Sequence, residues 1–311
     1  MRILYMGTPE FALPSLSLLL DHSYSIPAVV TVPDKAQGRG QKPGFSPVKK
    51  FAIERGLEVL QPESLKDTAF HHLVASLKPD LIVVVAFRIL PPEVYNLAPR
   101  GAFNLHASLL PKYRGAAPIN WAIINGEKET GVTSFFLRES VDTGSVILQA
   151  RMKIGPDETA GELHDRLAAV GAEIVLQSVR LIERGGVRLH DQDETQASKA
   201  PKIFKDDCRV DWNKPSEAVH NFVRGLSPIP SAWTTHKGKV LKLYRTRLIQ
   251  NVTTGEKSSP GTVAATEGDE LTIQAGDGVI SIVELQQEGR KRINAAEFLS
   301  GYDLHAGDLL Q

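Results

Sequence analysis

Three polar side chains have the types and spacing that acyl transfer to an amine requires. Asn104 and His106 stand at the end of an apolar run that predicts a strand, and residues two apart on a strand point to the same face. An amine that attacks an acyl carbon makes an oxyanion, to which Asn104 and a protonated His106 could donate hydrogen bonds. Asp142, in a predicted turn, could favour the charged imidazole and relay the proton that the amine releases. No covalent intermediate and no metal are needed.

The same residues also have a purely structural interpretation. An Asn-x-His pair at a strand end is often only hydrogen-bonded within the fold. Asp142 opens an Asp-Thr-Gly sequence, in which aspartate commonly forms the turn. Spacing alone therefore leaves both interpretations open.

The first half of the chain alternates short apolar runs with amphipathic stretches, which predicts a doubly wound α/β sheet with mostly parallel strands. The run 81–87 is apolar on both alternating faces, as a central parallel strand must be when helices cover both sides. Ligands of such sheets bind beyond the carboxyl ends of the strands, where Asn104 and His106 lie. The expected strands are 2–6, 28–32, 80–87 and 102–106, and the expected helices are 11–20, 47–55, 70–77 and 118–125.

A second domain is predicted after residue 205. Two more strands (129–137 and 145–154) flank the turn 140–144, and a long helix follows at 159–183. Residues 190–205 are polar and lack periodicity, which is typical of a linker. Beyond one helix at 216–224, short β-prone segments separated by Gly- and Asp-rich turns predict a small OB-like barrel. We therefore expect a catalytic domain at 1–189, a linker at 190–205 and a C-terminal domain at 206–311.

Composition excludes several classes of protein. Hydrophobic and charged fractions of 42% and 23% are those of an ordinary globular chain. No stretch approaches the roughly 18 consecutive apolar residues of a membrane span, and no secretory signal opens the chain. The lone Cys208 can form neither an internal disulfide nor a cysteine-rich zinc site. We expect a monomer in the cytoplasm.

Net charge is zero, but the basic residues cluster along the chain. Residues 35–50 contain five basic side chains and no acid, and residues 199–247 contain eleven basic side chains against four acids. Two local surfaces could therefore bind a polyanion, although clustering along a chain need not mean clustering in space. A nicotinamide or P-loop function is disfavoured, because neither G-x-G-x-x-G nor G-x-x-x-x-G-K-[ST] occurs. The glycines of 38–44 indicate a mobile basic loop.

The run Phe103-Asn-Leu-His-Ala-Ser-Leu-Leu-Pro-Lys-Tyr-Arg-Gly-Ala-Ala-Pro118, together with Asp142-Thr-Gly, resembles the formyltransferases that use 10-formyltetrahydrofolate. Within that family the chain is most similar to the members that act on methionyl initiator tRNA. The segments Gly7–Phe11, Asp34–Gly40, Asp193–Thr195 and Asp211-Trp212 carry this closer likeness, which covers nearly all 311 residues.

The resemblance implies a role for each candidate residue. Asn104, His106 and Asp142 would be the catalytic set. The folate pocket would be lined by Ser108, Leu109, Leu110 and Pro111 and by Ala86, Phe87, Arg88, Ile89 and Leu90. The tRNA would be bound by the basic loop through Arg39, Lys42 and Lys35, and by the barrel through Lys205, Arg209, Lys237, Lys239 and Lys242. Phe87-Arg88 replaces the Tyr-Gly pair of many members, and we expect this bulkier, charged segment to alter how the folate ring is held.

Three alternatives remain. A formyltransferase for a nucleotide-linked amino sugar would share the catalytic set, but the 38–44 insertion and the basic second domain favour tRNA. A glycinamide ribonucleotide formyltransferase should lack the last hundred or so residues. A non-catalytic RNA-binding protein would not need Asn104, His106 and Asp142 together.

Overall fold

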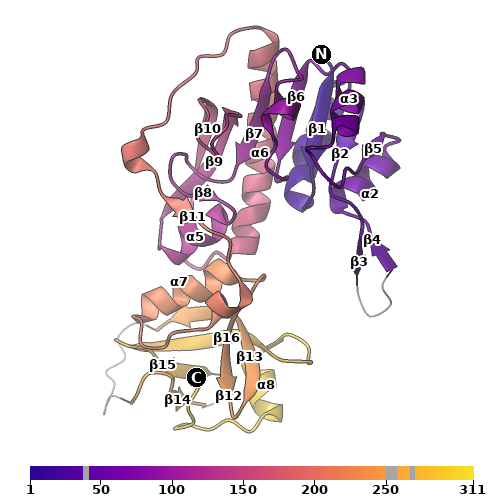
Figure 1. The fold of residues 1–311 in the computed structure, drawn as a ribbon. Coiled ribbons are helices and arrows are strands. Elements are labelled where there is room, and N and C mark those ends of the chain that lie inside the picture. The colour runs from indigo at the N-terminus through magenta and orange to yellow at the C-terminus, as the bar shows by residue number, and fades with distance from the viewer. Residues whose placement is uncertain (38–41, 250–257, 267–269) are drawn as a thin grey trace. The chain divides into compact units, whose positions relative to one another are not determined.

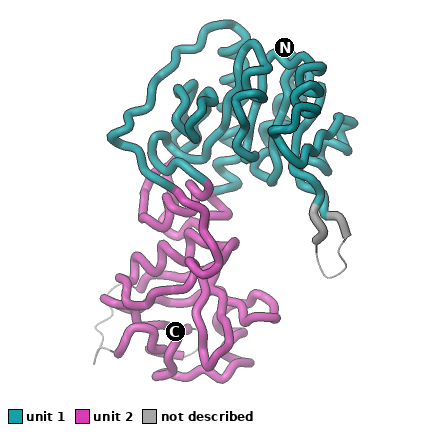
Figure 2. Tube along the Cα trace, in the orientation of Figure 1, with its two compact units in different colours: residues 1–115, 131–152, 164–199 teal, residues 116–130, 153–163, 200–311 magenta. Residues whose placement is uncertain are grey.

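The computed structural model describes residues 1–37, 42–249, 258–266 and 270–311. Contacts between residues divide the chain into two compact units (Figure 2). Unit 1 comprises residues 1–115, 131–152 and 164–199, and unit 2 comprises residues 116–130, 153–163 and 200–311. The domain boundaries expected at 189/190 and 205/206 stay a prediction.

A seven-stranded sheet forms the centre of unit 1 (Figure 1). Its order is β10-β9-β7-β6-β1-β2-β5, and β5, β2, β1, β6 and β7 run parallel, whereas β9 pairs antiparallel with β7. The strands are β1 (Ile3–Gly7), β2 (Val29–Val30), β5 (Val59–Leu60), β6 (Leu81–Val85), β7 (Ala102–His106), β9 (Glu129–Phe136) and β10 (Val146–Lys153). The doubly wound, mostly parallel sheet expected from the sequence is confirmed.

The central strands are buried because helices cover them. All five residues of β6 are buried, which explains why that stretch lacks a polar face. Ser46 and Asp67 accept hydrogen bonds from backbone N–H groups in the first turns of α2 and α3, and so cap these helices. The helices are η1 (Glu10–Ala12), α1 (Leu13–Asp21), α2 (Pro47–Glu54), α3 (Thr68–Ser76), α4 (Pro92–Tyr95) and α6 (Ala160–Glu183), whose first residues count with unit 2.

The flanks of the basic loop pair with each other, where the sequence indicated no regular structure. β3 (Lys35–Gln37) and β4 (Lys42–Gly44) are antiparallel, with Lys35 opposite Gly44. Beside this pair, Lys49 Nζ lies 2.5 Å from Asp34 Oδ2 and 2.7 Å from Gln61 Oε1. Lys49 therefore binds within unit 1, although its position in the basic cluster suggested a role in binding a polyanion.

Unit 2 contains an antiparallel sheet in the order β12-β13-β16-β15-β14, with β17 beside β16. Its strands are β12 (Ala232–His236), β13 (Lys239–Leu248), β14 (Val263–Ala265), β15 (Leu271–Gln274), β16 (Val279–Gln287) and β17 (Ile293–Asn294), and its helices are α5 (Pro118–Ile124), α7 (Ser216–Leu226) and α8 (Ala295–Gly301). One core includes Trp212, Val223, Leu243, Ile273 and Phe298. This confirms the OB-like second domain. No helix in the described ranges is long and apolar enough to cross a membrane.

The polar stretch 190–205 has more structure than a linker was expected to have. It contains η2 (Glu194–Gln196), β11 (Lys199–Ala200), which pairs with β8 (Arg114–Gly115), and the start of η3 (Lys205–Cys208). Elsewhere the expected elements are found with ends shifted by a few residues. The elements that the sequence did not indicate, such as β5 and β17, are mostly too short to show a period.

Candidate active site

Strand β7 carries Asn104 and His106 to the carboxyl edge of the sheet in unit 1. It lies between β6 and β9, with Asn104 opposite Val84 and Phe135 and with His106 opposite Thr133. The alternation of a strand places both side chains on one face. The two predicted residues therefore stand together where ligands of α/β sheets bind.

His106 is buried and held in one orientation. Only 6% of the residue is exposed. Its Nε2 lies 2.8 Å from the Tyr113 carbonyl oxygen. Because a carbonyl oxygen only accepts, Nε2 carries the hydrogen and donates it. Nδ1 lies 3.8 Å from Asp142 Oδ2, which is too long for a hydrogen bond. Nδ1 is therefore the ring nitrogen that remains for proton transfer, with a carboxylate beside it.

Asp142 lies in the turn between β9 and β10, at a φ of 56°, in the left-handed region that aspartate and asparagine adopt more readily than most residues. Its Oδ2 accepts a hydrogen bond of 2.9 Å from the Gly115 N–H. Gln192 Nε2 donates to the carbonyl oxygens of Asp142 and Gly144, at 2.8 and 2.9 Å. A Cβ at Gly144 would overlap the Phe136 carbonyl oxygen, so the turn packs directly on β9. The carboxylate is thus fixed from several sides.

Asn104 differs from the other two residues of the predicted set in the hydrogen bonding of its side chain. It is half-buried, and within the described ranges its carboxamide forms no hydrogen bond. A partly exposed amide with unused N–H groups on a rigid strand is what an oxyanion donor requires. The structure thus brings His106 and Asp142 together and leaves the Asn104 amide available on the same strand as His106.

The segment Ser108–Pro111 is held by a network that the sequence did not reveal. Ser108 is fully buried, and its Oγ donates to the Lys112 carbonyl oxygen at 2.6 Å. Thr133 Oγ1 donates to the Ser108 carbonyl oxygen at 2.7 Å and accepts from the Leu110 N–H at 3.1 Å. Gln149 Nε2 donates to the Leu110 carbonyl oxygen at 2.8 Å. The Ser108 hydroxyl is therefore used inside the protein, and the segment offers a fixed shape.

The segment after β6 contains the departure Phe87-Arg88. The Arg88 guanidinium donates to the carbonyl oxygens of Pro62 and Glu63, at 2.8 and 3.1 Å, and its Cζ lies 5.1 Å from the centre of the Phe87 ring. Burial lowers the pKa of Arg88. The charge is thus engaged by backbone oxygens of the protein itself. The remaining residues of this segment are Ala86 and Ile89, which are exposed, and Leu90, which is buried.

Comparison with known proteins identifies the family. Residues 1–179 match the family described as formyl transferase, and residues 202–303 match the formyl transferase C-terminal domain. The methionyl-tRNA formyltransferase of Chlorobium luteolum is 48% identical over 305 residues, which cover 97% of this chain and 97% of that protein. The chain belongs to the methionyl-tRNA formyltransferase family. The methionyl-tRNA formyltransferase of Caldanaerobacter subterraneus is 43% identical, with full coverage of both chains.

The fold is also shared with more distant formyltransferases of known structure. The N-formyltransferase from Helicobacter canadensis, solved in complex with folinic acid and dTDP-3-aminofucose, is 20% identical. It covers 91% of this chain and 98% of its own, with a TM-score of 0.69. At this identity the likeness concerns the fold.

In this member of the methionyl-tRNA formyltransferase family, several residues that hold the candidate site were not predicted from the sequence. Thr133 and Gln149 hold the segment Ser108–Pro111, and Gln192 holds the turn of Asp142, through side-chain to backbone hydrogen bonds. No spacing rule marks such residues, because their partners are carbonyl and amide groups distant in sequence.

Within the described residues, no group of three or more His, Cys, Asp or Glu side chains could hold a metal ion.

The residues predicted to bind tRNA are distributed over both units. Arg39 lies outside the described residues. Lys35 and Lys42 begin β3 and β4. In unit 2, Lys237 lies 3.4 Å from Asp303 and 3.8 Å from Asp308, so much of its charge is compensated. The other predicted cations of unit 2 lie by aromatic rings or beside Trp233: Lys239 over Tyr302, Arg209 over Trp233, Lys242 opposite Trp233 on the neighbouring strand, and Lys205, whose carbonyl oxygen accepts from the Trp233 indole.

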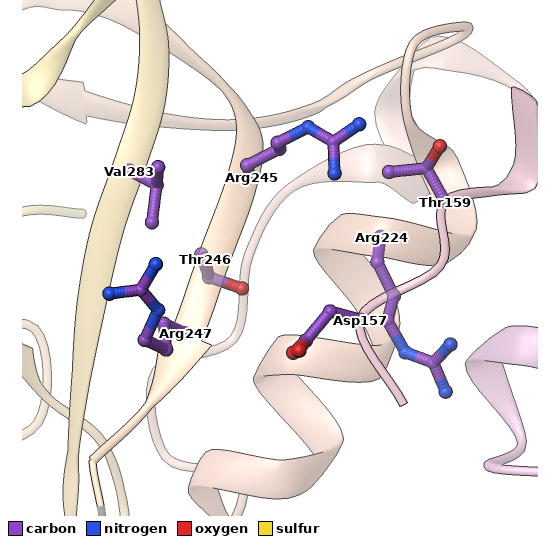
Figure 3. Close-up of a pocket in the computed structure, with 7 residues that line it drawn as sticks. All are labelled: Asp157, Thr159, Arg224, Arg245, Thr246, Arg247 and Val283. Carbon is purple, nitrogen blue, oxygen red and sulfur yellow. The ribbon is translucent and has the colours of Figure 1, made fainter. Parts of the chain in front are cut away.

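A second group of arginines in unit 2 surrounds a cavity of about 100 Å³ (Figure 3). Arg224 is only 3% exposed and donates to the carbonyl oxygens of Gly155 and Glu158. Arg245 is paired with Glu162. These two arginines therefore hold α7 and β13 to residues 155–162, and their charges are used within the unit.

Proposed function

We propose that this protein transfers the formyl group of 10-formyltetrahydrofolate to the amino group of methionyl initiator tRNA, by direct attack of the amine. The position of the Asp142 carboxylate near His106 Nδ1, at the same site as the Asn104 amide, supports formyl transfer. The likeness to methionyl-tRNA formyltransferases over nearly the whole chain supports the tRNA as the acceptor. We propose these three residues as the catalytic set of this member of the methionyl-tRNA formyltransferase family.

The proposed roles follow from the atoms that remain free. 10-Formyltetrahydrofolate supplies an activated formyl group, so that the amine nitrogen gains the one-carbon unit and the folate nitrogen loses it. Asn104 donates an N–H to the formyl oxygen, where negative charge develops, and such a donor is typically worth about 10²–10³ in rate. His106 Nδ1 takes the proton released by the amine, because Nε2 is bound to the Tyr113 carbonyl oxygen. Asp142 stabilises the imidazolium that results, and the imidazolium gives this proton to the folate nitrogen as its bond to the formyl carbon breaks.

For the folate, we propose a pocket lined by Ser108–Pro111 and by residues 86–90. The Ser108 hydroxyl is bound to the Lys112 carbonyl oxygen and the Arg88 guanidinium to carbonyl oxygens of residues 62–63. The Ser108 hydroxyl and the two terminal nitrogens of Arg88 are therefore engaged within the protein, whereas Arg88 Nε is buried and has no hydrogen-bond partner among the described residues. We propose that these segments contribute backbone groups and apolar surface, including the half-buried side chains of Leu109 and Phe87.

For the tRNA, we propose contacts from Arg39, Lys42 and Lys35 and from the cations of the barrel. Phosphate contacts of this kind supply affinity and salt dependence. Replacing Arg39 with alanine should weaken productive tRNA binding and reduce the slope of log K against log salt by about 1. Titrations of the variant at several salt concentrations measure this slope. An unchanged slope and affinity would remove Arg39 from the interface.

The substrate proposal is tested by formyl transfer from 10-formyltetrahydrofolate to three acceptors: methionyl initiator tRNA, a nucleotide-linked amino sugar and glycinamide ribonucleotide. We expect turnover with the tRNA alone. Turnover with the amino sugar and none with the tRNA would refute the assignment. Since formylated initiator tRNA serves translation, we also propose that the protein acts in the cytoplasm, as a monomer, which size-exclusion chromatography with light scattering would check.

A further inference from the structure

Phe204 is the more exposed of the two phenylalanines in the described ranges that stand out from the surface. It is 59% exposed, against 41% for Phe45. A single exposed apolar residue is common and needs no explanation by itself. The surroundings of Phe204, however, are those of a prepared binding surface.

The backbone that carries the ring is held rigidly. The Phe204 N–H donates to Asp207 Oδ2 at 2.8 Å, and the Phe204 carbonyl oxygen accepts from the Asp207 N–H at 3.1 Å. The same oxygen lies 3.2 Å from the Sγ of Cys208, which is buried. Ile203, on the other side, packs against the core of unit 2. The ring is therefore presented from a fixed backbone, which lowers the entropy cost of binding something on it.

Basic residues lie near this ring in space or in the chain. Lys202 Nζ lies 5.2 Å from the centre of the Phe204 ring, and Lys205 follows it in the chain. The Trp233 indole donates to the Lys205 carbonyl oxygen at 2.9 Å, and Arg209 Cζ lies 5.8 Å from the centre of the Trp233 ring. The turn 204–209 is thus attached to β12. It contains Lys205 and Arg209, and Lys202 precedes it in the chain. We call Phe204 and these three cations the aromatic-basic patch.

An exposed aromatic ring among cations is the chemistry of binding to single-stranded nucleic acid. Bases stack on the ring, and cations bind the flanking phosphates. A docking site for an apolar protein surface would instead extend the apolar area, whereas the residues beside this ring are charged or packed in the core. The acids nearby are Asp206 and Asp207, and Asp207 is occupied by the Phe204 N–H.

We propose that Phe204 is a stacking residue for an unpaired nucleotide of the tRNA, with the cations of the aromatic-basic patch on the adjacent phosphates. This inference rests on the proposed function, because it takes the tRNA as the substrate. It adds a contact of a different kind from the phosphate contacts proposed above. Stacking on a ring depends weakly on salt, whereas phosphate contacts depend on it strongly.

Phe204→Leu tests the inference, because it keeps an apolar side chain of similar size and removes the π face. We expect the KM for methionyl-tRNA to rise about tenfold, with kcat at saturating tRNA unchanged and the salt slope unchanged. Lys205→Gln should instead reduce the slope by about 1. Phe204→Trp should have a KM close to that of the wild type, because it keeps an aromatic ring. The tryptophan fluorescence of this variant should be quenched by tRNA more strongly than that of the wild-type protein. Thermal unfolding checks that each variant is folded.

The outcomes separate this inference from the proposed function. A wild-type protein that does not formylate methionyl-tRNA refutes the function itself. If the wild type is active and Phe204→Leu keeps its KM within about twofold, the stacking contact does not exist. A salt slope in Phe204→Leu that falls as in Lys205→Gln would show that the ring only positions the lysines, and would also overturn the proposal.

Discussion

Replacing Asp142 with asparagine isolates the charge of the carboxylate from its structural contacts. Asparagine keeps an oxygen for the Gly115 N–H and is suited to the positive φ at this position. The carboxylate lies 3.8 Å from His106 Nδ1, and both side chains are at least nine-tenths buried. At an effective dielectric constant of about 20, two unit charges at this distance attract by roughly 4 kcal/mol. In the proposed mechanism the imidazole takes the proton of the amine, so this attraction would stabilise the transition state, and we expect kcat to fall by about 10²–10³.

The assay is single-turnover formyl transfer to methionyl-tRNA at saturating donor and acceptor, with thermal unfolding measured in parallel. Asp142→Asn should unfold at nearly the wild-type temperature, since the turn keeps its hydrogen bonds from Gly115 and Gln192. Asp142→Ala should lose stability as well as activity, because it removes the acceptor. A rate constant for Asp142→Asn within about threefold of the wild type would show that the carboxylate charge does not assist His106.

Three further changes test the site and its frame. Asn104→Ala should lower kcat by about 10²–10³ with tRNA affinity unchanged, and a tenfold or smaller loss in single-turnover assays would exclude an oxyanion role. Gly144→Ala should displace the turn that holds the Asp142 carboxylate, so that both the unfolding temperature and kcat fall; a variant with wild-type values for both would contradict the packing. Burial raises the pKa of Glu162, but hydrogen bonds from Thr159 and Arg245 outweigh it and lower the pKa to about 2. The ionised carboxylate therefore stabilises the fold above about pH 4.5, and this contribution is lost as pH falls towards 2. Urea unfolding should show Glu162→Gln to be less stable by about 1 kcal/mol at most near neutral pH, because the side chain is nearly half exposed, with the difference vanishing in acid. A difference independent of pH would refute this.

The sequence predicted the strand that carries Asn104 and His106 well because its pattern is simple. An apolar run that ends in Asn-x-His gives both the strand and its carboxyl edge, and the structure begins and ends β7 at Ala102 and His106. The turn with Asp142 also followed from the Asp-Thr-Gly sequence between two apolar stretches. Sequence patterns of this kind predict the elements and the edge of the sheet, and they place the candidate side chains near one another.

The state of those side chains could not be predicted in the same way. His106 Nε2 donates to the Tyr113 carbonyl oxygen, and a pattern of side chains does not encode a bond to a backbone group. The engagement of Lys49 by Asp34 and Gln61 depends on tertiary contacts between residues that the sequence separates. Charge clustering along the chain overstated the cations available to a polyanion for this reason.

The stretch 190–198 shows why a segment without periodicity need not be a passive connection. Gln192 holds the turn of Asp142, and Ser198 Oγ accepts a 2.9 Å hydrogen bond from the Tyr113 N–H, while the Tyr113 carbonyl oxygen orients His106. One polar segment therefore supports both members of the histidine–carboxylate pair. A segment that supports others through side-chain hydrogen bonds to their backbone carbonyl and amide groups needs polar side chains at irregular spacing and no apolar face. The stretch lacks a hydrophobic period, which led us to expect a linker. A supporting segment of this kind also needs no such period.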